Sequence, residues 1–292
     1  MIIRWIASPL LVCARFVLPH LSKVARSPSL VLYRCFTFKQ MYNLETMTSH
    51  VMYPTLKSVL EVFQDEKYKA DDNVSKLLKI YADAESNAKP VAKNHPLIVL
   101  EGLDLSGKST LSRLLAKKIN AVNLKSPPSC ISSELRAAFD DSADLKTAFY
   151  ALGNYIAAFE IAKTLETQPV VLDRFWNSTA ANALARNVQA KPGGYDLPAR
   201  GNPVYRWPAD LIQPDVVLFL SVSEHERQRR QARRKEVTKE EMMLKEIHSF
   251  RQNVLLAYQY MEEPAIQMVN SDVSVAETLD GILKSIAHII KI

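Results

Sequence analysis

The chain has 292 residues, of which 48% are hydrophobic and 23% charged, an ordinary composition for a globular protein. Disordered and fibrous classes are therefore excluded, and the length allows one sizeable core with appendages. The net charge of +6 suggests a nucleic-acid binder at first sight. Of the 37 basic residues, however, six lie in residues 1–44, which contain no acid, and the remaining 31 are balanced by 31 acidic residues. The body of the chain is thus neutral, and we expect no nucleic-acid partner.

The N-terminal arm, residues 1–44, predicts a mitochondrial transit peptide, with the matrix as its destination. It is basic, free of acid and rich in Arg, Ser, Leu and Val. The alternatives are a secretory signal with residues 2–12 as its apolar region, a membrane anchor, and an unprocessed tail. Arg4 and Arg15 enclose only ten residues, too few for a helix that spans a bilayer. We therefore expect no stable membrane insertion.

Residues 45–94 are predicted to form a helical N-terminal extension or linker. This stretch is polar, rich in lysine and free of glycine. Apolar residues recur in it at helical spacing in two groups: Val59, Leu60 and Phe63, then Leu77, Leu78 and Tyr81. No chemistry is predicted for these residues.

Residues 95–292 predict one α/β domain with a five-stranded parallel sheet flanked by helices. Five short apolar runs occur, at residues 97–100, 121–124, 170–172, 216–220 and 266–269. Helical segments separate most of them, and such runs are typical of a parallel sheet covered on both faces. The single cysteine of this region, Cys130, cannot build a disulfide framework or a zinc site.

A phosphate-binding loop follows the first of these runs. The pattern G-x4-G-K-[ST], with one further threonine, is matched by Gly102, Leu103, Asp104, Leu105, Ser106, Gly107, Lys108, Ser109 and Thr110. It stands between a predicted strand and a predicted helix, the context that supports the motif. Its backbone N–H groups and the helix N-terminus would bind the phosphates of ATP. Lys108 would bridge the β- and γ-phosphates, and Ser109 would bind Mg²⁺. The fold is therefore predicted to be that of a P-loop NTPase.

Three segments resemble the thymidylate kinase family over about residues 95–292. Glu101-Gly102-Leu103-Asp104 with Gly107-Lys108-Ser109-Thr110 is similar to the E-G-x-D-x-x-G-K-S/T-T loop of that family. Asp173-Arg174-Phe175 is similar to its D-R-[YF] motif. Residues 214–220 are similar to a strand of that family that follows a Pro-Asp pair. The resemblance implies a nucleoside-monophosphate kinase that uses ATP and Mg²⁺ and that forms a homodimer.

Four further segments, residues 125–130, 152–155, 203–208 and 250–252, resemble the mitochondrial UMP-CMP kinase branch. This implies phosphorylation of CMP, UMP, dCMP and dUMP to diphosphates for nucleotide synthesis in mitochondria. Two departures from thymidylate kinases weaken the case for dTMP. The family's F-P-x-R is replaced by Ser126-Pro127-Pro128-Ser129, without an arginine, and its base-reading N-R pair by Asn154-Tyr155.

The resemblance also suggests roles around the acceptor. Arg174 would clamp the acceptor phosphate, because a guanidinium binds phosphate through two parallel hydrogen bonds. Asp173, at the carboxyl end of a strand, would hold Mg²⁺ through water or orient Arg174. Asp104 would meet the acceptor sugar or a Mg²⁺-bound water, unless it only forms the turn. The remaining predicted acceptor contacts are Pro127 and Asn154, with Tyr155 and Phe175 stacking on the base.

An arginine-rich segment near residue 230 predicts a kinase lid. It contains Arg227, Arg229, Arg230, Arg233, Arg234 and Lys235. Because Leu105 leaves the P-loop without an arginine, Arg227 and Arg233 are predicted to neutralise charge on the transferring phosphoryl group. A solvated helix face and a nucleic-acid patch are the alternatives.

Other functions also fit parts of the pattern. A thymidylate kinase or a deoxynucleoside kinase would use the same P-loop on another acceptor. A GTPase-like switch is disfavoured, because the guanine-reading N-K-x-D motif is absent. A non-catalytic nucleotide-binding protein would have a degenerate site, whereas Lys108, Ser109, Asp173 and Arg174 are intact.

Overall fold

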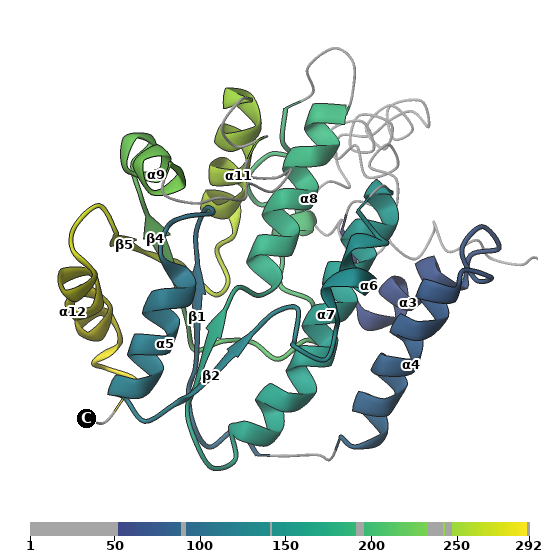
Figure 1. The fold of residues 1–292 in the computed structure, drawn as a ribbon, viewed down its shortest axis with the longest axis horizontal. Coiled ribbons are helices and arrows are strands. Elements are labelled where there is room, and N and C mark those ends of the chain that lie inside the picture. The colour runs from purple at the N-terminus through teal and green to yellow at the C-terminus, as the bar shows by residue number, and fades with distance from the viewer. Residues whose placement is uncertain are drawn as a thin grey trace, which may run out of the picture. The chain divides into compact units, whose positions relative to one another are not determined.

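The structure, a computed structural model, describes residues 52–88, 92–140, 142–190, 196–232, 242 and 247–290 (Figure 1). These residues belong to one compact unit, Ser49–Ile292. The predicted transit peptide and Arg233 lie outside the described residues. In the described part of the chain, no helix is both long and apolar enough to cross a membrane.

The centre of the molecule is a sheet of five parallel strands in the order β2-β3-β1-β4-β5. The strands are β1 (Leu97–Glu101), β2 (Val122–Lys125), β3 (Val170–Asp173), β4 (Val216–Ser221) and β5 (Ile266–Asn270). All five predicted runs are strands, so the predicted α/β fold is confirmed. The carboxyl ends of β1 and β3 are neighbours, since Leu100 is paired in register with Asp173. Parallel α/β sheets bind their ligands at such ends.

Helices cover both faces of the sheet, as Figure 1 shows. They are α5 (Lys108–Lys118), α6 (Ser133–Ala137), α7 (Ala143–Thr164), α8 (Trp176–Ala190), α9 (Glu224–Gln231), α11 (His248–Tyr260) and α12 (Val275–Ile286), with a 3-10 turn at Pro203–Tyr205. Leu218 and Leu220 of β4 join the core formed with α5 and α12. Phe219, between them in sequence, packs edge to face on Tyr258 of α11, with 4.7 Å between ring centroids. This alternation follows the period of two of a strand.

Two helices precede the sheet, α3 (Leu56–Gln64) and α4 (Asp72–Ser86). Thr55 and Asp71 cap their N-termini by accepting hydrogen bonds from backbone N–H groups of the first turn. The Phe63 ring of α3 meets Phe139 at 6.4 Å, and the Tyr81 ring of α4 meets Phe159 of α7 at 6.0 Å. Both helices are therefore packed against the domain that carries the P-loop.

Replacing Phe63 by alanine is expected to lower the free energy of unfolding by about 3–5 kcal/mol, because this side chain is fully buried. Urea denaturation would measure the change. Lys57→Ala, on the exposed side of the same helix, is the control and should change stability by less than about 0.5 kcal/mol. A similar small effect of Phe63→Ala would show that α3 does not contribute to the core.

Candidate active site

The P-loop connects β1 to α5 through backbone conformations that favour glycine. Gly102 and Gly107 have φ angles of 144° and 95°, and Leu105 has 70°. A Cβ atom on Gly102 would lie 2.8 Å from the backbone oxygen of Leu220 in β4. Only glycine fits there, because the loop passes directly over the neighbouring strand.

The loop is braced from outside by Arg230 of α9 and by Ser271, which follows β5. Arg230 donates hydrogen bonds to the backbone oxygens of Leu105 (3.0 Å) and Ser271 (2.5 Å). The Ser271 hydroxyl donates to the backbone oxygen of Ser106 at 2.7 Å. The arginine-rich segment thus supports the phosphate loop through a residue for which the sequence had suggested no role of its own.

Lys108 is buried at the start of α5. Its Nζ donates to the backbone oxygen of Leu103 (2.7 Å) and to the Ser106 hydroxyl (3.3 Å). Burial, with the nearby charge of Arg174, lowers the pKa of Lys108 to about 8. Because its two partners are neutral, the ammonium lacks a directly bound counter-charge and suits an anionic ligand.

Ser109 and Asp173 form an oxygen-rich pair beside this lysine. The Ser109 hydroxyl donates to Oδ2 of Asp173 at 2.5 Å, across from α5 to the end of β3. Oδ1 of Asp173 is buried and has no hydrogen-bond partner within the described residues. Hydroxyl and carboxylate oxygens are ligands that Mg²⁺ prefers, alone or through its waters. The unsatisfied oxygen therefore fits the predicted Mg²⁺ site.

Arg174 follows at a left-handed backbone position, with a φ angle of 66°. Its guanidinium donates to the backbone oxygen of Gly102 (3.2 Å), the Ser178 hydroxyl (3.0 Å) and the carboxylate of Asp104. Burial alone would raise the pKa of Asp104, but the charges of Arg174 and Lys108 outweigh it and lower that pKa. Asp104 is therefore an ionised partner of Arg174 at neutral pH.

Glu101, the last residue of β1, shapes the turn that carries Arg174. It is fully buried, and its Oε1 accepts from the backbone N–H groups of Phe175 (2.9 Å) and Ser178 (3.1 Å). Its Oε2 accepts from the hydroxyls of Tyr258 (2.9 Å) and Ser178. Burial raises the pKa of Glu101 against the opposing influence of Arg174 and these donors. Glu101 thus fixes the direction of Arg174 from beneath.

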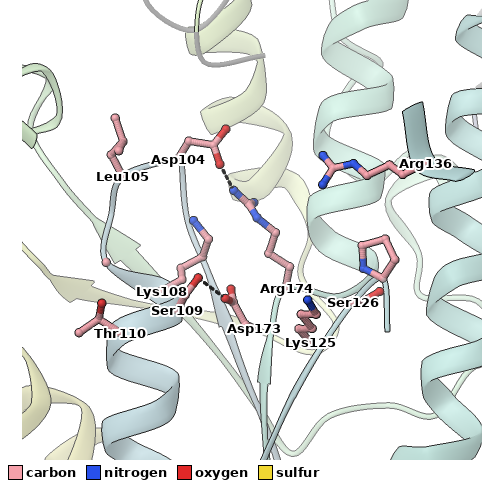
Figure 2. A pocket seen from close by; sticks show the side chains of 12 residues that line it. Asp104, Leu105, Lys108, Ser109, Thr110, Lys125, Ser126, Arg136, Asp173 and Arg174 are labelled. Atoms are coloured by element: carbon pink, nitrogen blue, oxygen red, sulfur yellow. Dashed lines mark hydrogen bonds and ion pairs between the residues drawn. The ribbon is translucent and has the colours of Figure 1, made fainter. Parts of the chain in front are cut away.

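A cavity of about 310 Å³ brings these groups together (Figure 2). Its lining residues are Asp104, Leu105, Gly107, Lys108, Ser109, Thr110, Lys125, Ser126, Pro127, Arg136, Asp173 and Arg174. Four of their side chains are basic and two are acidic. Such a cavity is suited to phosphate groups.

Three predicted acceptor contacts lie behind the cavity wall. Asn154 is buried, accepts from the Ser126 hydroxyl (2.5 Å) and donates to Thr179 (3.1 Å), so it fixes the loop that carries Pro127. The Tyr155 hydroxyl donates to Asp210 at 2.6 Å. The Phe175 ring is buried 5.5 Å from Trp207. Base stacking by Tyr155 and Phe175 remains a prediction.

Arg227 is fully buried on α9 and does not line the cavity of the described residues. Its Nε and one terminal nitrogen each donate to the Glu224 carboxylate at 2.8 Å. Its other terminal nitrogen is buried without a hydrogen-bond partner in the described part of the chain. With Arg233 outside the described residues, the lid remains a prediction.

Two basic cavity residues, Lys125 and Arg136, had no role in the sequence analysis. Lys125 ends β2 inside a segment that resembled the UMP-CMP kinase branch, and this was a usable signal. Arg136 belongs to no motif. It reaches the cavity because α6 follows β2 and packs beside α7, a contact that no local pattern predicts.

A parallel sheet with an intact P-loop at the end of its first strand defines a P-loop nucleotide-binding fold. The family model described as thymidylate kinase matches residues 100–282. The chain belongs to the thymidylate kinase family, as its motifs predicted.

Two relatives illustrate the range of the similarity. Over 194 residues, the chain is 45% identical to human "UMP-CMP kinase 2, mitochondrial". The aligned region covers 66% of this chain and 42% of the human protein. The chain thus spans less than half the length of that relative. A solved thymidylate kinase from Candida albicans has a TM-score of 0.52 at 22% identity, over 67% of this chain and 92% of that one. It supports the P-loop kinase fold.

Replacing Asp173 by asparagine is expected to raise the Mg²⁺ concentration for half-maximal activity about 10-fold, because it removes the carboxyl group that accepts from Ser109 in the described cavity. A Mg²⁺ titration at fixed ATP would measure it. Asp280→Asn, on the exposed side of α12, is the control. An unchanged Mg²⁺ requirement in Asp173→Asn would mean that this carboxylate takes no part in binding the ion.

Proposed function

We propose that the chain is an ATP-dependent kinase that converts CMP, UMP, dCMP and dUMP to their diphosphates. The observation that carries this proposal is that the P-loop Lys108 and the acceptor-side Arg174 line one cavity. Family membership supports the reaction class. The printed name of the human relative, UMP-CMP kinase 2, supports the acceptors.

In the proposed reaction, an oxygen of the acceptor phosphate bonds to the γ-phosphorus of ATP. The bond from that phosphorus to the β-bridging oxygen breaks, and its electron pair leaves with ADP. The second pKa of a phosphate monoester is about 6, so the attacking oxygen is already ionised at neutral pH. No general base is needed, and the site has to supply alignment and positive charge.

The residues around the phosphates divide the work in this scheme. The P-loop backbone and Lys108 hold the phosphates of ATP, and Arg174 holds the acceptor phosphate opposite them. Ser109 and Asp173 would hold Mg²⁺, which when bound neutralises phosphate oxygens. Arg227 and Arg233 would add charge from the lid, and the unpaired buried nitrogen of Arg227 supports a place for an anion beside it.

The charges also favour a monophosphate over a nucleoside as acceptor. A nucleoside hydroxyl must lose a proton and needs a basic carboxylate within reach. Asp104 is committed to Arg174, and its lowered pKa makes it a poor base. Asp173 already accepts from Ser109. A phosphate acceptor instead matches the excess of basic side chains.

Selection of the base is the second element of the proposal. Thymidylate kinases carry a base-reading arginine at the position that Tyr155 occupies in this chain. The Tyr155 hydroxyl donates a hydrogen bond to Asp210. This difference supports cytosine and uracil over thymine. Thymidylate kinase activity on dTMP is the second candidate, because the family model carries that name.

We further propose a mitochondrial matrix protein that forms a homodimer and binds no nucleic acid. The basic, acid-free arm and the mitochondrial human relative support the location. Residues 1–44 fused to a fluorescent protein should enter mitochondria, and a cytosolic signal would contradict the location. Analytical ultracentrifugation of the chain tests the dimer.

An ADP-release assay on the full chain with ATP and Mg²⁺ tests the activity. The acceptor panel contains CMP, UMP, dCMP, dUMP, dTMP, AMP, GMP and the free nucleosides. Turnover on the four cytosine and uracil monophosphates is expected. Turnover on dTMP alone would overturn the base selection, and turnover on nucleosides alone would overturn the acceptor class.

A further inference from the structure

Arg136, on the short helix α6, reaches the cavity from the side opposite the P-loop. Figure 2 shows its guanidinium pointing toward the pair formed by Asp104 and Arg174. Pro127 also borders this space. All four residues line the same cavity of about 310 Å³. Because both arginines line this one cavity, a phosphate group bound in it has a guanidinium on each of two sides.

The position of Arg136 is fixed by the packing of α6. Leu135 and Phe139, on either side of it, are buried. The Phe139 ring stacks on Phe149 of α7 at 5.0 Å. The Arg136 guanidinium carbon lies 5.3 Å from the ring centroid of Tyr150, a cation–π contact that orients the side chain. Its aim at the cavity is therefore supported by the core.

The two arginines differ in how far their donors are used. Arg174 makes three hydrogen bonds, to Gly102, Ser178 and Asp104, out of five N–H groups. Among the described residues, the Arg136 guanidinium has no hydrogen bond or ion pair, only its contact with the Tyr150 ring. All five N–H groups of the Arg136 guanidinium are thus left for a ligand, whereas Arg174 keeps two, the Nε–H and one on Nη2.

The loop before α6 supplies no other guanidinium. The residues after Pro127 are Pro128 and Ser129. The loop that borders the cavity therefore contributes no arginine that could bind a phosphate. Lys125 also lines the cavity, but an ammonium is a point charge and does not pair with two phosphate oxygens in a fixed plane.

We propose that Arg136 binds the phosphate of the acceptor nucleotide, with two parallel hydrogen bonds, while Arg174 holds the same group from the side of Asp104. This inference rests on the proposed function, which requires a monophosphate acceptor. In this proposal, Arg136 contacts the phosphate of the acceptor nucleotide and neither its sugar nor its base. It also gives α6 a role in selecting monophosphates over nucleosides.

The test compares Arg136→Met with the wild type, using the full chain. Loss of one charge-assisted pair is expected to raise the KM for CMP about 10- to 100-fold. The KM for ATP should change less than about 2-fold. Cytidine, which lacks the phosphate, should inhibit both proteins with the same inhibition constant. Arg136→Lys should recover part of the loss, because it restores charge without the planar edge.

Arg113→Met is the matched control, since Arg113 is an exposed arginine of α5 that does not line the cavity. It should leave all these constants unchanged. Circular dichroism of each variant establishes that it is folded. An unchanged KM for CMP in folded Arg136→Met would overturn the inference. So would equal weakening of CMP and cytidine, which would place Arg136 at the nucleoside.

The wild-type protein separates this inference from the proposed function. Turnover on dTMP in place of CMP would overturn the proposed base selection, and the Arg136 comparison would then be made with dTMP and thymidine. A folded wild type that bound no monophosphate in calorimetry would overturn both.

Discussion

Replacing Lys108 by methionine should lower the rate of phosphoryl transfer about 10³-fold, because it removes the buried positive charge of the P-loop. ADP release at saturating ATP and CMP would measure the loss. Lys118→Met, at the exposed end of the same helix, is the matched control and should keep full activity. Undiminished turnover of Lys108→Met would exclude this loop as the site of transfer.

The same substitution should make the empty protein more stable at pH 7, by up to about 3 kcal/mol. Folding lowers the pKa of Lys108 from 10.5 to about 8. Below pH 8 the folded protein therefore carries a buried positive charge on Lys108, which lowers its stability. This cost is absent from the methionine variant. As the pH rises from 8 toward 10.5, folded Lys108 loses its proton first and the difference should shrink. Urea denaturation of the variant and the wild type at pH 7 and 9.5 would measure the stability difference and its decrease with pH. A variant less stable than the wild type at pH 7 would contradict the account.

Replacing Arg174 by alanine is expected to reduce kcat/KM for CMP by about 10²- to 10³-fold, because the acceptor phosphate loses its clamp and Asp104 loses its partner. Binding of ATP alone, measured by calorimetry, should change less than about 3-fold. The turn itself should persist, since Glu101 holds it through the backbone N–H groups of Phe175 and Ser178.

Arg174→Lys is the companion variant. It keeps the charge, but one ammonium nitrogen replaces the two terminal nitrogens that contact Gly102, Ser178 and Asp104, so it should recover only a small part of the activity. A loss confined to ATP affinity in either variant would mean that Arg174 belongs to the donor side of the cavity.

Local patterns were sufficient for the sheet and the P-loop. All five apolar runs became strands. The three central strands, β1, β3 and β4, are buried over most of their length between the layers of helices. The edge strands β2 and β5 contain the polar residues Asn123 and Gln267 and pair in register with β3 and β4. The P-loop was readable because Gly102 and Gly107 are demanded by backbone conformation and by the strand beneath. Asp173 and Arg174 were readable because they end a strand.

The remaining parts of the site depend on contacts between segments distant in sequence. Arg136 reaches the cavity through the packing of Phe139 on Phe149 and Phe63. Arg230 reaches the P-loop only because β4 and β5 place α9 and Ser271 next to it. The sequence showed a row of arginines, and helical spacing alone could not decide which of them faces the loop.

The most direct test of the account is transfer of label from ATP carrying a radioactive γ-phosphate, with CMP as acceptor and Mg²⁺ present. Chromatography of the products should show the label in CDP, at a rate equal to ADP release. Label that appeared only in inorganic phosphate, with or without CMP, would show an ATPase and contradict the proposed kinase.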